Sequence, residues 1–295
     1  MRSSIALLVL LFAAAVGPAR VSAYCQATTV QAPLMCPTVC VTEGTRVGWE
    51  TPEIEFALNM RGFPGLSDAA VRAALVASFS TWQDVACGGR PLGFRFSQLL
   101  QSTALTVGPI ETEPNLNVIS WLSAQEWAQL GFGSSEFART KVWFDEHTGE
   151  IVGADIAFNG SIMPLTVCPD STSCAPTAVD LQNVATHEIG HFLGLAHSAD
   201  PAATMWCSAA RGDHEKRSLG EDDSAGLCAI YKNGAAFMDQ VPVQQAQGTP
   251  MHSGAGGGCA IGADRTARAY LPWGLLLLAL RRRRALRRPT SRLRR

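Results

Sequence analysis

Apolar positions along the chain follow two periodicities, and each predicts a different kind of element. A helical period marks residues 67–86, with Ser67 as N-cap, and residues 179–192. Alternating apolar and polar residues between turn signals predict strands. The strands cover residues 54–60, 93–97, 116–120, 141–144 and 151–158, with a short helix at 123–130 among them. Apart from that short helix, the predicted order is strand, helix, four strands and a second long helix.

A short apolar run near the start of the chain lies outside this pattern. Residues 5–16 follow Arg2 and precede the small-residue sequence Val21-Ser-Ala23, which predicts a secretory signal peptide over residues 1–23. A transmembrane anchor is the alternative. The run is shorter than the ~20 apolar residues that cross a bilayer, so a cleaved signal peptide is favoured.

The C-terminal end carries a second apolar run. A patternless linker, residues 233–258, leads to Cys259, the apolar residues 271–280 and an arginine-rich block that ends at Arg295. This order resembles the tripartite sorting tails of myxobacterial surface proteins, which implies that residues 259–295 are cleaved and that the protein is secreted or held at the cell surface. The alternatives are a short transmembrane tail anchor and a disordered basic tail.

Removal of both ends changes the charge balance of the 295-residue chain. Its formal net charge is −1, but residues 24–258 contain 11 Lys and Arg against 24 Asp and Glu, a net charge of −13. Nucleic-acid binding requires a basic surface, so the composition argues against it. Membrane contact is expected only through the signal peptide and the C-terminal tail, and we expect a monomer.

The chain has nine cysteines, which in an exported protein are expected to form disulfides. We predict two pairs, Cys168 with Cys174 and Cys207 with Cys228, although spacing alone does not assign them. Cys259 belongs to the sorting segment. The four remaining cysteines, expected to pair among themselves, are Cys25, Cys36, Cys40 and Cys87.

The most informative stretch is Thr186 to Ser198, THEIGHFLGLAHS. His187 and His191 are four residues apart on the predicted helix, so both imidazoles project from one face and can bind one metal ion. Gly194 permits a turn that brings His197 to the same ion. Three imidazoles leave one position of a tetrahedral zinc open for water, and Glu188 lies beside it as a general base. An amphipathic helix with two satisfied histidines is the alternative.

The residues that follow narrow the interpretation. The run Ser198-Ala-Asp-Pro-Ala-Ala-Thr-Met205 and the later segment from Leu219 to Tyr231 are similar to the HSxDPxAxM motif and C-terminal helix of the matrixins, within the metzincin metallopeptidases. The resemblance is strongest over residues 184–232 and extends, in element order, to about residue 46. It implies an α+β fold: a twisted, mostly parallel sheet with one antiparallel edge strand, a long N-terminal helix, the zinc-binding helix and a C-terminal helix.

The resemblance also implies a function, a zinc metalloendopeptidase that hydrolyses internal peptide bonds of proteins. His187, His191 and His197 would bind one catalytic zinc, and Glu188 would accept the proton of its water. Met205 would form the apolar Met-turn beneath the histidines, and the substrate would pair, extended, with an edge strand. The implied domains are a disulfide-tied extension over 24–45 and a catalytic domain over 46–232, with no second folded domain.

Three further features bear on the comparison with the family. Trp206-Cys207 follows Met205 where the family usually has Met-Tyr-Pro. The depth and preference of the substrate pocket are therefore not predicted. The acidic turn 145–150 is a candidate calcium site, with a solvated turn as the alternative, and only His147 is present for a second zinc. Cys36 or Cys40 would be a zinc-blocking cysteine switch only if it were not in a disulfide.

Two other functions compete with peptide hydrolysis. The same zinc and Glu188 could hydrolyse an ester or a small amide, and the fold could serve as a non-catalytic surface binding module. The match beyond the third histidine favours a peptidase over the first. The presence of Glu188 together with all three histidines favours an enzyme over the second.

Overall fold

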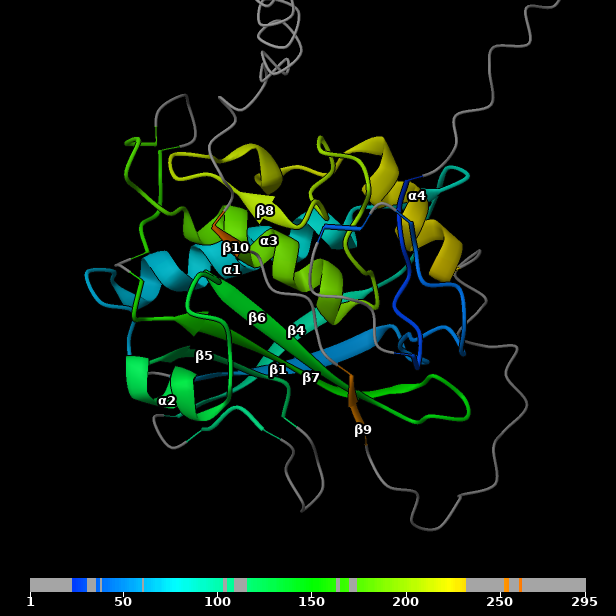
Figure 1. The fold of residues 1–295 in the computed structure, drawn as a ribbon, viewed down its shortest axis with the longest axis horizontal. Coiled ribbons are helices and arrows are strands. Elements are labelled where there is room, and N and C mark those ends of the chain that lie inside the picture. The colour runs from blue at the N-terminus through cyan, green and yellow to red at the C-terminus, as the bar shows by residue number, and fades with distance from the viewer. Residues whose placement is uncertain are drawn as a thin grey trace, which may run out of the picture.

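In this computed structural model the main helices lie over one face of a twisted sheet (Figure 1). The structure describes the following residues: 23–30, 36–37, 39–59, 61–102, 105–108, 116–162, 165–169, 174–231, 252–254 and 260–261. The predicted signal peptide up to residue 22, most of the linker and nearly all of the C-terminal tail lie outside these ranges. None of the helices formed by the described residues combines the length and apolar content that a membrane span requires.

The described strands form one main sheet in the order β4-β1-β5-β7-β6-β9. Strands β1, β4, β5 and β7 run parallel, whereas β6 pairs antiparallel with β7. The prediction of a mostly parallel sheet with an antiparallel strand at its edge is confirmed. The strand bounds are β1 Glu53–Asn59, β4 Arg95–Ser102, β5 Val118–Leu122, β6 Ala138–Phe144, β7 Ile151–Asn159 and β9 His252–Gly254.

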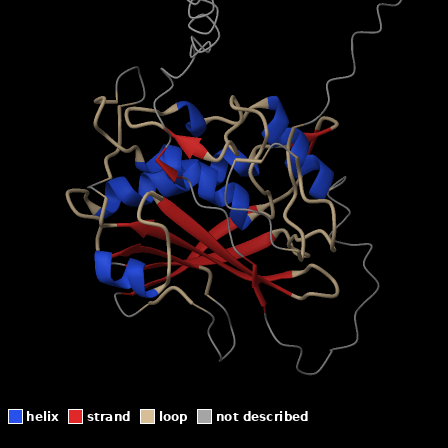
Figure 2. Cartoon of the chain, viewed as in Figure 1, coloured by secondary structure: helices blue, strands red, loops and turns tan. Residues whose placement is uncertain are grey.

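Two helices, α1 (Asp68–Gln83) and α3 (Leu181–Phe192), cover the sheet, as the helix layer of Figure 2 shows. Ser67 caps α1, as predicted, by accepting a hydrogen bond from the backbone N–H of Ala70. The side chain of Trp82 is completely buried, and its Nε1 donates to the carbonyl oxygen of Thr186 at 2.7 Å. Helix α1 therefore holds α3 in position by apolar packing and by a buried hydrogen bond.

Smaller elements surround this core. They are the helices α2 (Ala124–Gln129) and α4 (Glu221–Ile230), a 3-10 turn at Glu215–Arg217, and the short strands β2 (Ala86–Cys87), β3 (Arg90–Pro91), β8 (Ser208–Ala209) and β10 (Ala260–Ile261). Helix α4 provides the predicted C-terminal helix. Strands β8 and β10 pair with each other above α3 in Figure 1, apart from the main sheet.

The N-terminal extension packs against the chain that follows α3. The N–H of Ala27 donates to the carbonyl of Gly194 at 2.8 Å, and the N–H of Ala196 donates to that of Cys25 at 2.9 Å. The side chain of Asp222, on α4, accepts hydrogen bonds from the N–H groups of Ala23 and Tyr24. The start of the described chain is thus joined both to the turn within the histidine motif and to helix α4.

The disulfides correct part of the sequence prediction. Cys168 pairs with Cys174, as predicted, but Cys207 pairs with Cys36 and not with Cys228. Cys228 pairs with Cys87 because α4 packs beside β2, whereas Cys207 directly precedes β8 and meets the N-terminal extension. The expectation that the remaining four cysteines pair among themselves is therefore wrong except for Cys25 with Cys40.

We predict that the Cys87–Cys228 disulfide stabilises the fold more than the Cys168–Cys174 disulfide. The first closes a loop of 141 residues and the second a loop of 6. Loop-closure entropy gives ~5 kcal/mol for the long loop and ~2 kcal/mol for the short one. Urea unfolding of Cys87→Ala/Cys228→Ala and of Cys168→Ala/Cys174→Ala measures both losses. Equal losses in the two double variants would contradict the ranking.

Candidate metal centre

The predicted metal ligands come from helix α3 and from the turn that ends it. His187 and His191 lie on α3, which is buried along almost its whole length. The helix stops at Leu193, and Gly194 adopts a positive φ of +91°. A Cβ at Gly194 would lie 2.4 Å from the carbonyl oxygen of Val47, so both the backbone angle and the close approach require glycine. This turn carries His197 back toward the helix.

The structure brings the three predicted histidines together. The ligand atoms of His187, His191 and His197 all lie within 4.8 Å of one another. Their rings are 4.8 to 5.3 Å apart between centroids, and all three side chains are buried. A cluster of this size matches the space around a single ion held by imidazole nitrogens.

Backbone carbonyls orient two of the imidazoles. Nδ1 of His187 lies 2.7 Å from the carbonyl oxygen of Thr204, and Nδ1 of His191 lies 2.8 Å from that of Leu195. A carbonyl oxygen only accepts, so each Nδ1 carries the proton and each Nε2 presents a lone pair. Both Nε2 atoms are buried without a hydrogen-bond partner among the described residues. A buried acceptor left in this way fits a metal ligand, and the donor set fits zinc.

The surroundings keep these imidazoles neutral. Burial lowers the pKa of His187 well below its ordinary value, and the nearby Lys216 ammonium lowers it further. Burial likewise lowers the pKa of His191 to about 4. Nζ of Lys216 lies 3.3 Å from Nδ1 of His187 and donates to the carbonyl of Trp206. Neutral imidazole is the form that binds a metal ion, so the site is prepared for one across the neutral pH range.

A carboxylate lies beside the cluster. Glu188 is completely buried, and its Oε2 accepts a hydrogen bond of 2.7 Å from Oγ1 of Thr140 on β6. The same hydroxyl lies 3.0 Å from the carbonyl oxygen of Glu188, and its single proton serves one of these two acceptors at a time. Thr140 was not singled out by sequence, because a threonine in an apolar strand gives no signal of its own.

Met205 lies directly against the metal-ligand helix. A Cβ at Gly190 would come within 3.0 Å or less of the Sδ and Cε atoms of Met205, so glycine between the two α3 histidines makes room for the methionine. The backbone N–H groups of Thr204 and Met205 each donate to the Asp223 carboxylate at 2.8 Å. Met205 thus lies against the helix that carries His187 and His191, and its role as a Met-turn stays a prediction. Asp223, which was not singled out from the sequence, anchors this segment.

The acidic turn 145–150, the candidate calcium site, lies outside the histidine cluster. In the acidic turn, the Asp145 carboxylate accepts from the N–H groups of His147 and Thr148 and so stabilises the hairpin itself. Calcium binding there stays a prediction.

Cys36 and Cys40 are both in disulfides, so neither offers the thiolate that a cysteine switch needs, and the disulfide interpretation is confirmed.

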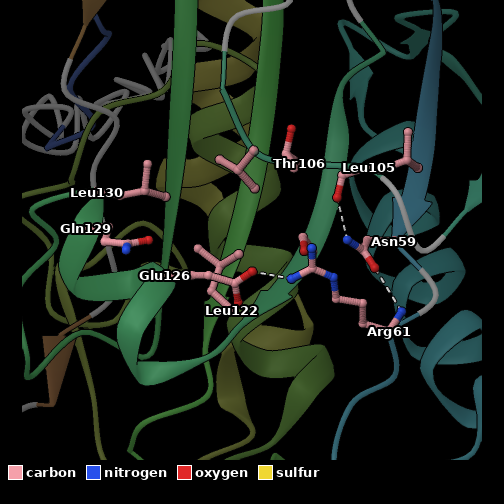
Figure 3. A pocket seen from close by; sticks show the side chains of 10 residues that line it. Asn59, Arg61, Leu105, Thr106, Leu122, Glu126, Gln129 and Leu130 are labelled. Atoms are coloured by element: carbon pink, nitrogen blue, oxygen red, sulfur yellow. Dashed lines mark hydrogen bonds and ion pairs between the residues drawn. The ribbon is translucent and has the colours of Figure 1, made fainter.

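A separate cavity of about 250 Å³ lies where α2 meets the sheet and contains none of the predicted site residues (Figure 3). Arg61 crosses it to pair with Glu126, and Asn59 bonds to the carbonyl of Leu105. The charged side chains in its lining, Arg61 and Glu126, pair with each other, and the remaining lining residues are uncharged. Its lining therefore offers no chemistry comparable to that of the histidine cluster.

Comparison with known proteins agrees with this geometry. Residues 117–232, from the start of β5 past the end of α4, match the sequence model of the family described as Matrixin. Over 62 residues the chain is 47% identical to metalloendoproteinase 1-MMP of Arabidopsis thaliana, covering 21% of the chain and 17% of that protein. Over 60 residues it is 37% identical to human matrilysin, covering 20% and 22%. This part of the chain is therefore matrixin-like, as the motif predicted.

A longer match is also present. The chain is 27% identical over 166 residues to metalloendoproteinase 2-MMP of Arabidopsis thaliana, which covers 55% of the chain and 37% of that protein. The chain thus spans well under half the length of each of these relatives. The resemblance of the C-terminal tail to myxobacterial sorting tails finds no counterpart in these matches and lies almost entirely outside the described residues.

We predict that zinc binds this cluster and stabilises the fold. A zinc concentration 100 times the dissociation constant adds ~2.7 kcal/mol to the free energy of unfolding, so the melting temperature rises. His191→Ala should lose both the bound zinc and the zinc-dependent rise in melting temperature. His147 is an exposed histidine of the acidic turn, so His147→Ala should keep both. Elemental analysis and thermal unfolding measure the two effects. A full shift in His191→Ala would contradict the assignment.

Proposed function

We propose that the protein is a zinc metalloendopeptidase that hydrolyses internal peptide bonds of proteins. The observation that carries this proposal is the buried carboxylate of Glu188 next to three histidines whose ligand atoms converge. The matrixin-like sequence from residue 117 to 232 supports peptide bonds as the substrate, since it extends well beyond the metal ligands.

Each residue of the site has a distinct role in the proposed reaction. His187, His191 and His197 would hold the zinc ion, and the Thr204 and Leu195 carbonyls fix two of the rings. When bound, zinc supplies Lewis acidity that polarises the scissile carbonyl and acidifies water. Glu188 accepts the proton of the attacking water and transfers it to the leaving amine as the C–N bond breaks. Thr140 holds the Glu188 carboxylate in place through its hydroxyl.

The borders of the site support an extended peptide as substrate. Strand β6 runs antiparallel to β7, pairs with the outermost strand β9 over Val142 to Phe144, and contacts Glu188 through Thr140, beyond that pairing. A peptide that adds to β6 gains main-chain hydrogen bonds and passes the catalytic carboxylate. The segment after Met205, with Trp206 and the disulfide-bonded Cys207, would form the opposite side of the site and set side-chain preference.

We further propose that the protein is exported. Four disulfides among the described cysteines are typical of an oxidising compartment, and the signal peptide predicted for residues 1–23 supports export. The proposed domain organisation keeps the extension 24–45, the catalytic domain 46–232, the linker 233–258 and a tail from residue 259.

The decisive test compares Glu188 variants in residues 24–231, which contain all four disulfides and the whole apolar core. Cleavage of casein and of a peptide library should occur in the wild type and stop with a chelator. Glu188→Ala should retain zinc and lose at least ~100-fold in kcat, within the range for a general base. The exposed Glu146→Gln is the matched control and should stay active. Cleavage by Glu188→Ala at the wild-type rate would refute the mechanism, and hydrolysis of esters alone would favour a different zinc hydrolase.

A second prediction concerns Thr140. Removal of a hydrogen bond to a charged group costs about 1.5–3 kcal/mol, so Thr140→Val should lower kcat roughly 10- to 100-fold with zinc content unchanged. Thr140→Ser retains the hydroxyl and should recover most of the rate. Thr148→Val, in the exposed turn, serves as the control. A Thr140→Val enzyme with normal kcat would show that this hydrogen bond has no role in catalysis.

A further inference from the structure

A buried lysine lies between the metal-ligand helix and the segment that follows Met205. Lys216 belongs to the 3-10 turn Glu215–Arg217 and is only 5% exposed. Its Nζ lies 3.3 Å from Nδ1 of His187 and donates to the carbonyl oxygen of Trp206. Lysine is rarely buried to this degree, because its ammonium then loses hydration. The position of this cation beside a metal ligand therefore points to a role in the site.

The turn that carries Lys216 is fixed to the first turn of α3. The N–H of Lys216 donates to Oδ1 of Asn183 at 2.7 Å. Next to it, Arg217 donates two hydrogen bonds, of 2.6 and 2.7 Å, to the carboxylate of Asp180, the N-cap of α3. Asn183 and His187 are four residues apart and lie on one face of the helix. The backbone of the turn is therefore held one helical turn from His187, and the lysine side chain runs from one to the other.

The ammonium approaches the imidazole of His187 at the nitrogen that is not left for an ion. Nδ1 donates its proton to the carbonyl oxygen of Thr204 at 2.7 Å, so it has no lone pair to accept a hydrogen bond from Lys216. The contact of 3.3 Å therefore brings a positive charge to the N–H side of a neutral ring. The field of this charge acts across the ring on Nε2, which is buried without a partner among the described residues.

A cation in this position affects a metal ligand in the opposite direction from the usual partner. A carboxylate or carbonyl that accepts the second ring N–H makes an imidazole a better electron donor to the metal. A positive charge at the same place withdraws electron density from Nε2, and it also repels a divalent cation. The ion would be held less tightly and, because its ligand donates less, would be a stronger Lewis acid.

We infer that Lys216 modulates the metal centre through His187: it lowers the affinity of the three histidines for zinc and makes the bound ion more electrophilic. This inference deepens the proposed function, and only its catalytic half rests on that function. Lys216 is thus a positioning residue, which acts through another side chain. Changes to the outer partners of metal-bound histidines alter metal affinity or activity by about 10- to 100-fold.

The test measures the zinc affinity of the full-length chain by competition with a chelator of known affinity. Lys216→Met removes the charge from a side chain of similar length. Lys216→Gln also removes the charge but retains an N–H donor for the Trp206 carbonyl. Both variants are expected to bind zinc about 10- to 100-fold more tightly than the wild type. Lys216→Arg keeps the charge and should bind zinc no more tightly than the wild type.

Lys141→Gln is the matched control, because it removes one positive charge elsewhere on the border of the site. Its neighbour Thr140 points toward Glu188, and side chains alternate along a strand, so Lys141 faces away from α3. This variant should have the zinc affinity of the wild type. The direction of the effect separates charge from structure, since a loosened site would lose zinc. Unchanged or weaker zinc binding in Lys216→Met and Lys216→Gln, with both folded by circular dichroism, would overturn the inference.

A second measurement addresses the catalytic half of the inference. On a quenched fluorescent peptide, Lys216→Gln should lower kcat about tenfold while KM changes little. Tighter zinc binding with a normal kcat would overturn this half. Tighter zinc binding in the Lys216 variants, with no peptidase activity even in the wild type, would support the effect on the metal centre and refute the proposed function alone.

Discussion

The constraint on which this structure depends is the burial of four polar side chains on one helix and its turn. His187, Glu188, His191 and His197 lie almost wholly out of water, where each unpaired polar atom carries a large cost. The Leu195 carbonyl, four residues past His191, is a local partner, whereas the Thr204 carbonyl and the Thr140 hydroxyl come from other segments, with the Nε2 atoms of His187 and His191 left for an ion. The sheet, the turn and the last helix are arranged to meet these requirements.

The turn around Met205 shows how closely these parts fit. The missing side chain at Gly190 admits the methionine, and the Asp223 carboxylate accepts N–H groups from the turn and from Gly220. Burial raises the pKa of Asp223 despite the three donors that oppose it, so helix α4 contributes a buried, fully hydrogen-bonded carboxyl beneath the site. The matrixin-like region therefore extends to residue 232 for a physical reason, since the last helix holds the turn beneath the histidines.

The sequence by itself determined the local features of this protein. The helical spacing of His187 and His191, the turn at Gly194, the order of the main elements and the short Cys168–Cys174 loop all follow from residues close together in the chain. Only the tertiary structure decided which cysteine meets Cys207, and which hydroxyl and carboxylate support Glu188 and the Met205 turn. Those contacts join segments far apart in sequence, and they depend on strand register and helix packing, which no local pattern encodes.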